Sequence, residues 1–238
     1  MNQTFPLRLE EERIRAAYAR RRNDAARYSW FSAGHLFFLQ ERERQVLTVL
    51  RQCGVSSLTS KIILEVGCGT GYWLREFLNW GASPENIIGI DLLPDRVAEA
   101  KRLCPKKVRI ECRNAEKLAF PDASFDLVLQ STAFSAILHR DMKRNIASEM
   151  LRVVKPDGLI LWYDYHVDNP WNPDVRGVTK KEIHELFPNC RIKLQRVTLV
   201  PPLVRVIGRY SWLACYLMGR IPWFCTHYLG AIQKQSYV

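Results

Sequence analysis

No stretch of the sequence is apolar for long enough to cross a membrane, although 47% of its 238 residues are hydrophobic. A membrane-spanning helix needs about 18 or more consecutive apolar residues. The most apolar stretch, residues 197–218, is interrupted by Pro201, Pro202, Arg205, Gly208 and Arg209. Internal repeats and low-complexity tracts are also missing. These absences argue against a multi-span membrane protein and a disordered chain, and the length favours one decorated globular domain.

The seven cysteines include no C-x-x-C pair, and they stand at positions 53, 68, 104, 112, 190, 215 and 225. The first 27 residues are polar and rich in arginine, without the apolar segment of a secretory signal. We therefore expect a reducing, cytoplasmic location, no metal site, and cysteines that act as small buried hydrophobic residues.

Acidic residues are missing altogether from residue 186 to the end of the chain, and the formal net charge is +11. Residues 1–60 carry ten Lys and Arg against six Asp and Glu, residues 61–170 carry fifteen of each, and residues 171–238 carry ten against three. The basic surface therefore belongs to the two flanks. A flank of this charge favours an anionic substrate, a membrane surface or a nucleic acid as partner.

The middle of the chain alternates short apolar runs with amphipathic segments, which predicts strands and helices in turn. Strands of this apolar kind indicate an α/β fold with a buried parallel sheet and helices on both faces. The expected strands are 61–66, 86–90, 108–111, 125–129, 159–163, 191–200 and 226–233; the expected helices are 8–27, 35–53, 72–80, 94–103, 137–153, 179–187 and 203–221.

The strongest local pattern is a strand, Ile62–Val66, followed by Gly67, Gly69 and Gly71 and then a helix. Alternate glycines let the backbone turn sharply and approach a ligand closely. The dinucleotide fingerprint G-x-G-x-x-G would need its third glycine at Tyr72. An acid, Glu65, stands two residues before the turn and suits an ammonium-bearing ligand better than a pyrophosphate. A second acid, Asp91, ends the next strand, where its two oxygens can accept from both hydroxyls of a ribose.

Five motifs in this order resemble those of class I S-adenosylmethionine (SAM)-dependent methyltransferases, over about residues 60–165. They are Glu65 with the glycine turn, Asp91, Asn114-Ala115-Glu116, Phe125-Asp126-Leu127-Val128, and Leu151-Arg152 with Lys155-Pro156 and Gly158. The resemblance implies a Rossmann-like, seven-stranded, mainly parallel sheet whose last strand is antiparallel, with SAM across the strand ends. It also implies one domain over residues 1–238: a helical lid (1–58), a SAM-binding core (59–165) and a substrate-side part (166–238).

Residue by residue, the resemblance assigns the methionine end of SAM to Glu65 and the turn, and the ribose to Asp91. Leu92 would lie against the adenine, whose edge would meet the segment Asn114–Glu116, and Gln130 would lie near the methionine. The resemblance thus gives these cofactor-binding candidates: Glu65, Gly67, Cys68, Gly69, Gly71, Asp91, Leu92, Asn114, Ala115, Glu116 and Gln130.

Methyl transfer needs alignment more than a dedicated base, so catalytic residues are hard to identify from sequence. The segments after the fourth and fifth strands each hold a histidine, His139 and His166, that can take a proton near neutral pH. Asp164 is expected to orient such a base or the substrate. Capping of a helix by His139, and a place in a polar loop for His166, are the structural alternatives.

The acceptor is expected to be a small molecule or a glycan- or lipid-type metabolite, methylated on oxygen or nitrogen. Gln130-Ser131-Thr132-Ala133-Phe134 lacks the Pro-Pro clamp typical of nucleic-acid amine methyltransferases, so no nucleic acid is expected. The overall pattern resembles bacterial enzymes of natural-product, glycan and quinone pathways. An RNA or protein methyltransferase and a non-catalytic SAM-binding regulator remain the alternatives, and the oligomeric state stays open.

The two flanks are expected to form the acceptor pocket. Tyr28, Trp30 and Phe31 would close over the cofactor or acceptor, or else pack the N-terminal helices onto the sheet. The helix predicted at 203–221 carries an apolar face and basic rims, typical of core packing or of contact with a lipid-linked acceptor at a membrane.

Overall fold

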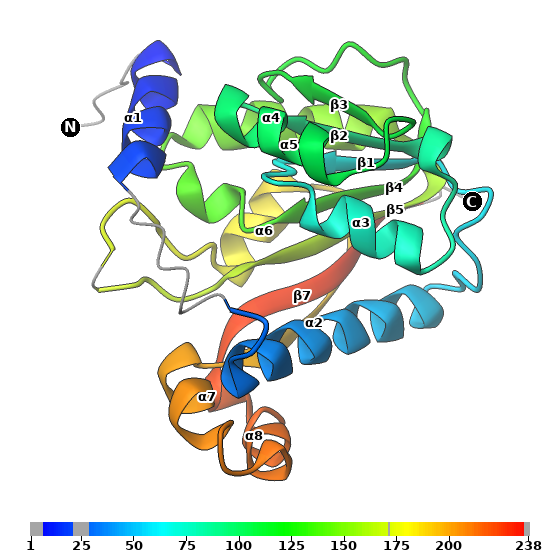
Figure 1. Cartoon of the computed structure of the whole chain (residues 1–238). Helices are drawn as coiled ribbons and strands as arrows, with labels where there is room; N and C mark the ends of the chain where they lie inside the picture. Colours follow the sequence, from blue (N-terminus) through cyan, green and yellow to red (C-terminus); the bar gives the residue numbers. More distant parts are fainter. Residues whose placement is uncertain (1–6, 21–28, 171, 236–238) are drawn as a thin grey trace.

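A seven-stranded sheet with the strand order β3-β2-β1-β4-β5-β7-β6 forms the centre of the molecule (Figure 1). The computed structural model describes residues 7–20, 29–170 and 172–235. All strands run parallel except β7, which is antiparallel to both β5 and β6. The expected α/β fold is therefore confirmed. The strands are β1 Ile63–Val66, β2 Ile87–Asp91, β3 Arg109–Cys112, β4 Phe125–Ser131, β5 Val154–Tyr165, β6 Cys190–Leu199 and β7 Cys225–Lys234.

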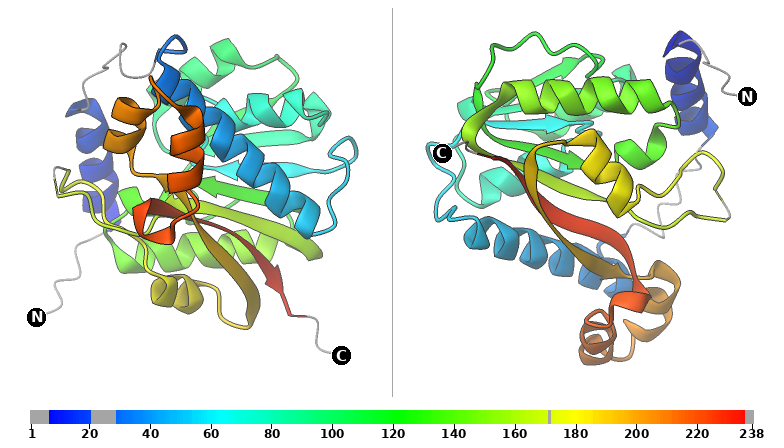
Figure 2. Two further views of the ribbon diagram at one scale, coloured as in Figure 1. Left: turned by 90° about the horizontal axis from the view of Figure 1, so that it is seen from below. Right: turned by 180° about the vertical axis from the view of Figure 1, so that it is seen from behind.

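Helices cover both faces of the sheet because its strands are apolar on both sides. One face is packed by α2 (Ala33–Gln52), α3 (Tyr72–Asn79) and α4 (Pro94–Leu103). The other is packed by α5 (Arg140–Val153) and α6 (Lys180–Leu186), as Figure 2 shows. Successive residues of β1 alternate between the two cores, with Ile63 in the first and Leu64 in the second. The sheet is therefore the middle one of three layers, with a layer of helices on each face.

The two N-terminal helices differ in role, which corrects the expectation that both form a lid. The first, α1 (Leu7–Arg20), lies across the carboxyl edge of the parallel strands. The second, α2, buries Val46, Val49 and Leu50 in the core instead. Residues 21–27 of the predicted first helix lie outside the described residues.

The single helix predicted at 203–221 is wrong, because the structure has two short helices there. They are α7 (Pro201–Ile207) and α8 (Trp212–Met218), followed by the 3-10 turn Pro222–Phe224. The break follows Gly208, and Ser211 then caps α8 by accepting a hydrogen bond from the amide of Ala214 at 3.1 Å. None of the helices in the described ranges is both long and apolar enough to span a bilayer.

Candidate active site

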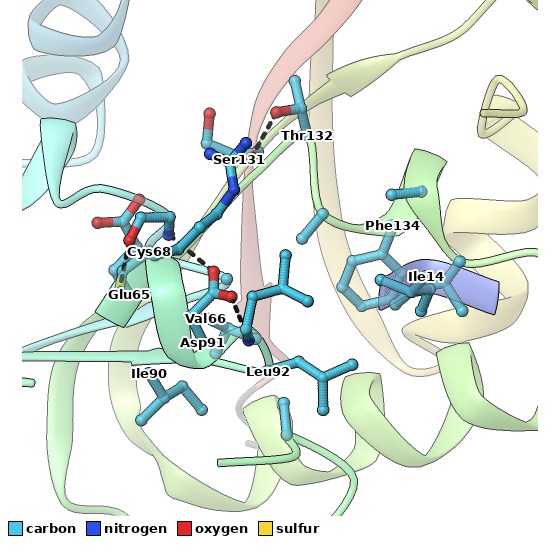
Figure 3. A pocket seen from close by; sticks show the side chains of 18 of the residues that line it. Ile14, Glu65, Val66, Cys68, Ile90, Asp91, Leu92, Ser131, Thr132 and Phe134 are labelled. Carbon is cyan, nitrogen blue, oxygen red and sulfur yellow. Dashed lines mark hydrogen bonds between the residues drawn. The ribbon is translucent and has the colours of Figure 1, made fainter. Parts of the chain in front are cut away.

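A cavity of about 270 Å³ opens at the carboxyl edge of the sheet, where β1, β2 and β4 end (Figure 3). This is close to the lower end of the ~300–1,000 Å³ that small-molecule sites span. Gly67 and Gly69 line it with φ of 75° and 54°, a region that glycine adopts without strain. Around a Cβ built on Gly69, the nearest atom is 3.7 Å away, so that position is open. The turn therefore presents bare backbone to whatever enters.

Asp91 lies at the end of β2 and ties the glycine turn to the next loop. Its carboxylate accepts hydrogen bonds from the amide of Gly69 at 2.8 Å and from the amide of Leu93 at 2.9 Å. Each carboxylate oxygen has a second lone pair. The two oxygens are thus fixed in orientation and still able to accept from a ligand.

Glu65 is buried at the end of β1, and its Oε2 has no hydrogen-bond partner among the described residues. Burial raises the pKa of Glu65 well above its usual range, and the charge of Asp91 adds to the rise. A buried carboxyl oxygen without a partner is costly unless a ligand satisfies it. This position therefore fits a cationic donor.

Arg42 of α2 lines the cavity opposite this acid, a residue that the sequence analysis missed. Its guanidinium carbon lies 4.5 Å from the ring centroid of Tyr72 and 4.7 Å from that of Trp73. Its Nε is buried and lacks a hydrogen-bond partner among the described residues. The two rings hold the cation by cation–π attraction and leave a donor for an anion. Tyr72 in turn donates its hydroxyl proton to Glu43.

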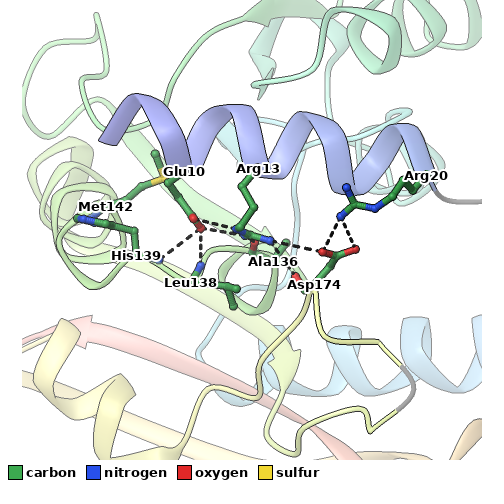
Figure 4. A network of polar contacts seen from close by, with 8 residues as sticks. All are labelled: Glu10, Arg13, Arg20, Ala136, Leu138, His139, Met142 and Asp174. Carbon is green, nitrogen blue, oxygen red and sulfur yellow. Dashed lines mark hydrogen bonds and ion pairs between the residues drawn. The ribbon is translucent and has the colours of Figure 1, made fainter. Parts of the chain in front are cut away.

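The outer wall of the cavity includes Ile14 and Tyr18 of α1; it is mostly apolar, with Arg96 stacked on the Tyr18 ring. Helix α1 is held there by a polar network (Figure 4). Glu10, almost fully buried, accepts from the amide of Leu138 at 2.6 Å and from Arg13 at 2.8 Å. Asp174, in the loop after β5, pairs with Arg20 at 2.9 Å. The lid is thus joined to the loops after β4 and β5.

Comparisons with known proteins agree with this geometry. A family model described as a methyltransferase domain matches residues 63–158. The 2-methyl-6-phytyl-1,4-hydroquinone methyltransferase of Synechocystis sp. is 33% identical over 213 residues, which are 84% of this chain and 64% of that protein. Residues 63–158 therefore form a class I SAM-dependent methyltransferase domain.

Two further known proteins are similar to this chain, one in sequence and one in fold. The 24-methylenesterol C-methyltransferase 2 of Oryza sativa subsp. japonica is 30% identical over 181 residues, 71% of this chain and 47% of that protein. The chain thus spans about half to two thirds of the length of these curated relatives. A solved 1,6-didemethyltoxoflavin-N1-methyltransferase of Burkholderia thailandensis, with bound S-adenosylhomocysteine, has a TM-score of 0.63 at 18% identity. The match covers 99% of this chain and 93% of that protein.

The residues that line the cavity fit SAM. The unpartnered oxygen of Glu65 can accept a hydrogen bond from an ammonium group, and the unpartnered nitrogen of Arg42 can donate one to a carboxylate. The carboxylate of Asp91 can accept from the two hydroxyls of a ribose. The bare backbone of Gly69 leaves room for a ligand chain, whereas the missing side chain of Gly67 lets Ala133 pack closely. Of the residues expected at the cofactor, those that line the cavity are Glu65, Gly67, Cys68, Gly69, Asp91, Leu92, Asn114 and Ala115.

Three expected cofactor residues lie outside the cavity lining, each for a structural reason. A Cβ on Gly71 would lie 2.8 Å from the Sγ of Cys104, so this glycine serves packing against α4. Gln130 is fully buried; its amide donates to the Tyr163 carbonyl and accepts from the Ala133 amide. Glu116 accepts hydrogen bonds from the side chains of Asn114 and Asn145.

The catalytic candidates are not among the residues that line the cavity either. His139 caps α5, since its Nδ1 accepts from the Met142 amide at 3.3 Å. The Nε2 of His166 lies 2.9 Å from the Cys225 carbonyl oxygen, and its ring packs on Tyr228. Asp164 is fully buried, which raises its pKa to about 6, and it accepts from the Ser135 and Tyr165 amides. None of these three lines the cavity, so a role for them in methyl transfer stays a prediction.

The aromatic residues expected to close the site do not do so in the described part of the chain. Tyr28 lies outside the described residues, and Trp30 and Phe31 are exposed and absent from the cavity lining. Tyr18 of α1 takes the place expected for them. Thr132, after β4, also lines the cavity, with a φ of 55° that is rare for a β-branched residue.

Proposed function

We propose that this protein transfers a methyl group from SAM to an apolar, lipid-type small molecule. The observation that carries the proposal is the convergence of Glu65, Asp91 and the bare glycine turn on one cavity with an apolar outer wall. Two curated relatives are named for a phytyl-substituted hydroquinone and a sterol, which supports an acceptor with an apolar body.

The cofactor contacts follow from the charges of the cavity. Glu65 receives the ammonium group of the methionine end, and Arg42 receives its carboxylate. Asp91 accepts from the ribose hydroxyls, and Leu92 and Ala115 pack against the adenine. Asn114 supports this wall through Glu11 of α1, to which its amide donates at 2.6 Å.

When bound, SAM supplies an electrophilic methyl group to which the acceptor atom adds in line with the leaving sulfur. The chain contributes orientation and exclusion of water. Ile14 and Tyr18 of the lid cover the cavity, and Thr132 fixes its wall near the end of β4.

We further propose that the methyl group is transferred to an oxygen or nitrogen atom. The proposal also includes a reducing, cytoplasmic location for the protein. The seven cysteines are unpaired in the structure, which supports a reducing compartment.

The test is incubation with SAM labelled in the methyl group, together with a lipid extract and an aqueous extract of the source organism. We expect label in a lipid product, whose mass spectrum shows one added methyl group. Calorimetry with S-adenosylhomocysteine gives cofactor binding separately. Tight binding without any labelled product favours a SAM-binding regulator, and label in RNA or protein favours the other alternative; both outcomes overturn the proposal.

A further inference from the structure

Residues 200–224 form an excursion from the sheet between β6 and β7. Leu199 and Cys225 are paired neighbours, so the excursion leaves and returns at one point. Since β6 runs parallel to β5, this point lies at the carboxyl edge, where the cavity also opens. Helices α7 and α8 project there beyond the sheet, beside the start of α2 (Figures 1 and 2). The excursion and the cavity therefore share one edge of the sheet: the cavity lies at the ends of β1, β2 and β4, the excursion lies at β6 and β7, and β5 runs between them.

The excursion exposes large apolar side chains to solvent. In α8, whose residues are nearly all apolar, only Cys215 is buried. The exposed fraction is 88% for Trp223, 76% for Tyr210 and 67% for Leu213. Phe31 is fully exposed at 101% and lies just before Gly34, whose backbone packs on α7. We call the exposed apolar side chains of the excursion the aromatic surface; its main members are Tyr210, Trp212, Leu213, Leu217, Trp223 and Phe224.

The charged residues of the excursion itself are all basic. Arg205, Arg209 and Arg220 are exposed, and none forms an ion pair with another described residue. The guanidinium carbon of Arg209 lies 4.8 Å from the Tyr210 ring centroid. No acidic residue occurs from 186 onward. A second copy of the chain would bring like charges together, whereas an anionic partner with an apolar interior complements both the arginines and the rings.

We propose that the aromatic surface docks onto the anionic face of a lipid bilayer. Tryptophan and tyrosine rings favour the layer between headgroups and acyl chains, and arginine stems extend apolar contact while the heads meet lipid phosphates. The cavity opens at the same edge of the sheet, so docking would turn that edge toward the bilayer in which an apolar acceptor dissolves. This last step rests on the proposed function; the docking does not.

The test measures sedimentation of the whole protein with vesicles of phosphatidylcholine alone, or of phosphatidylcholine mixed with phosphatidylglycerol. We expect binding to the mixed vesicles to exceed binding to the neutral ones. Leu213→Ser with Trp223→Ser should weaken binding to both by at least about tenfold. Arg205→Gln, Arg209→Gln and Arg220→Gln should each weaken binding to the mixed vesicles only, by about fivefold.

Matched controls lie at the opposite edge of the sheet. Leu103→Ser removes an exposed leucine at the end of α4, and Lys106→Gln with Lys107→Gln removes two exposed charges before β3. We expect these variants to bind vesicles as the unaltered protein does. Absence of vesicle binding, or equal losses in the controls, overturns the docking proposal. It is also overturned if Leu213→Ser instead abolishes a concentration-dependent dimer, or if the arginine variants lose RNA binding in place of vesicle binding.

Calorimetry with S-adenosylhomocysteine on the same preparations separates the two proposals. Intact cofactor binding without vesicle binding overturns the docking alone. Vesicle binding without cofactor binding overturns the proposed methyl transfer and leaves the docking standing.

Discussion

The carboxylate of Asp91 accepts a hydrogen bond from the amide of Gly69 at 2.8 Å, across 22 positions of sequence. The residue expected to bind the ribose therefore also fixes the turn that is expected to face the methionine. Any change at Asp91 thus acts on the fold and on the cofactor together, and the two effects need separate measurements.

Asp91→Ala should weaken SAM binding roughly a hundredfold, because two charge-assisted contacts to the ribose are lost. It should also lower the free energy of unfolding by about 2 kcal/mol, because the Gly69 and Leu93 amides lose their acceptor. Calorimetry gives the first value and urea unfolding the second. Asp95→Ala, at an exposed position of α4, is the control and should change neither. Normal affinity in a folded Asp91→Ala protein contradicts the ribose assignment.

Gly69→Ala and Gly54→Ala form a matched pair, since both glycines have positive φ (54° and 80°) and no atom within 3.5 Å of a built Cβ. Each substitution should lower the free energy of unfolding by about 1–2 kcal/mol. Only Gly69→Ala places a methyl group in the cavity, so only it should weaken binding of S-adenosylhomocysteine, by about tenfold or more. Equal affinities for the two variants would mean that the turn does not contact the ligand.

Arg42→Met should weaken binding of S-adenosylhomocysteine by about tenfold or more, because the methionine carboxylate loses a charged donor. Binding of 5′-methylthioadenosine, which has no carboxylate, should be unchanged. Arg44→Met on the same helix removes an arginine that is paired with Glu41 and should affect neither ligand. Parallel losses for both ligands would show that Arg42 only supports the packing of Tyr72 and Trp73.

Binding of SAM should release a proton from Glu65. Burial raises the pKa of this carboxyl in the free protein, and a bound ammonium group lowers it again. Affinity should therefore rise with pH below about pH 7, where the amino group of SAM stays protonated. Calorimetry in buffers of different ionisation enthalpy measures the released proton. Glu65→Gln should abolish the release, and an unchanged release in that variant would assign it elsewhere.

Attachment of the lid should depend on the charge of Glu10. Burial alone would raise its pKa, but hydrogen bonds from Arg13, Leu138 and His139 outweigh this effect and lower it below 4.5. The ionised form is thus favoured by folding, and its stabilisation is present at neutral pH and lost as the pH falls through the lowered pKa.

Glu10→Gln should therefore lower the free energy of unfolding at pH 7 by about 2 kcal/mol, with the difference shrinking below about pH 4.5. It should also speed the release of S-adenosylhomocysteine, because Ile14 and Tyr18 lie on the same helix. Glu12→Gln, on the exposed side of α1, is the control. A deficit that persists unchanged at pH 3 would show that the charge of Glu10 is not involved.

The cofactor side of the cavity could be predicted because its residues follow each other in short local patterns. The glycine turn and Asp91 each end an apolar strand, so their place at one edge follows from the parallel sheet. Arg42 could not be predicted in this way. It is one of many arginines in the N-terminal flank, and only the packing of α2 against α3 brings it to Tyr72 and Trp73.

Some candidate residues stand at the expected strand ends, but their side chains are already bonded to other groups of the protein. Gln130 and Asp164 stand at strand ends near the cavity, but backbone amides and carbonyls occupy their side chains. Sequence spacing shows where a residue stands and not which groups satisfy it. The break between α7 and α8 was signalled by Gly208 and Ser211, but the apolar residues around them favoured one longer helix.

The pairing of Leu199 with Cys225 makes residues 200–224 a module that can be exchanged. The two ends of the module are adjacent on antiparallel strands, so a short hairpin turn would join them without changing the register of the sheet. The glycine turn, Asp91 and Glu65 lie on other strands and would keep their positions. Natural selection, or an engineer grafting an excursion from another methyltransferase, can therefore change where the protein finds its acceptor while leaving its use of the methyl donor intact.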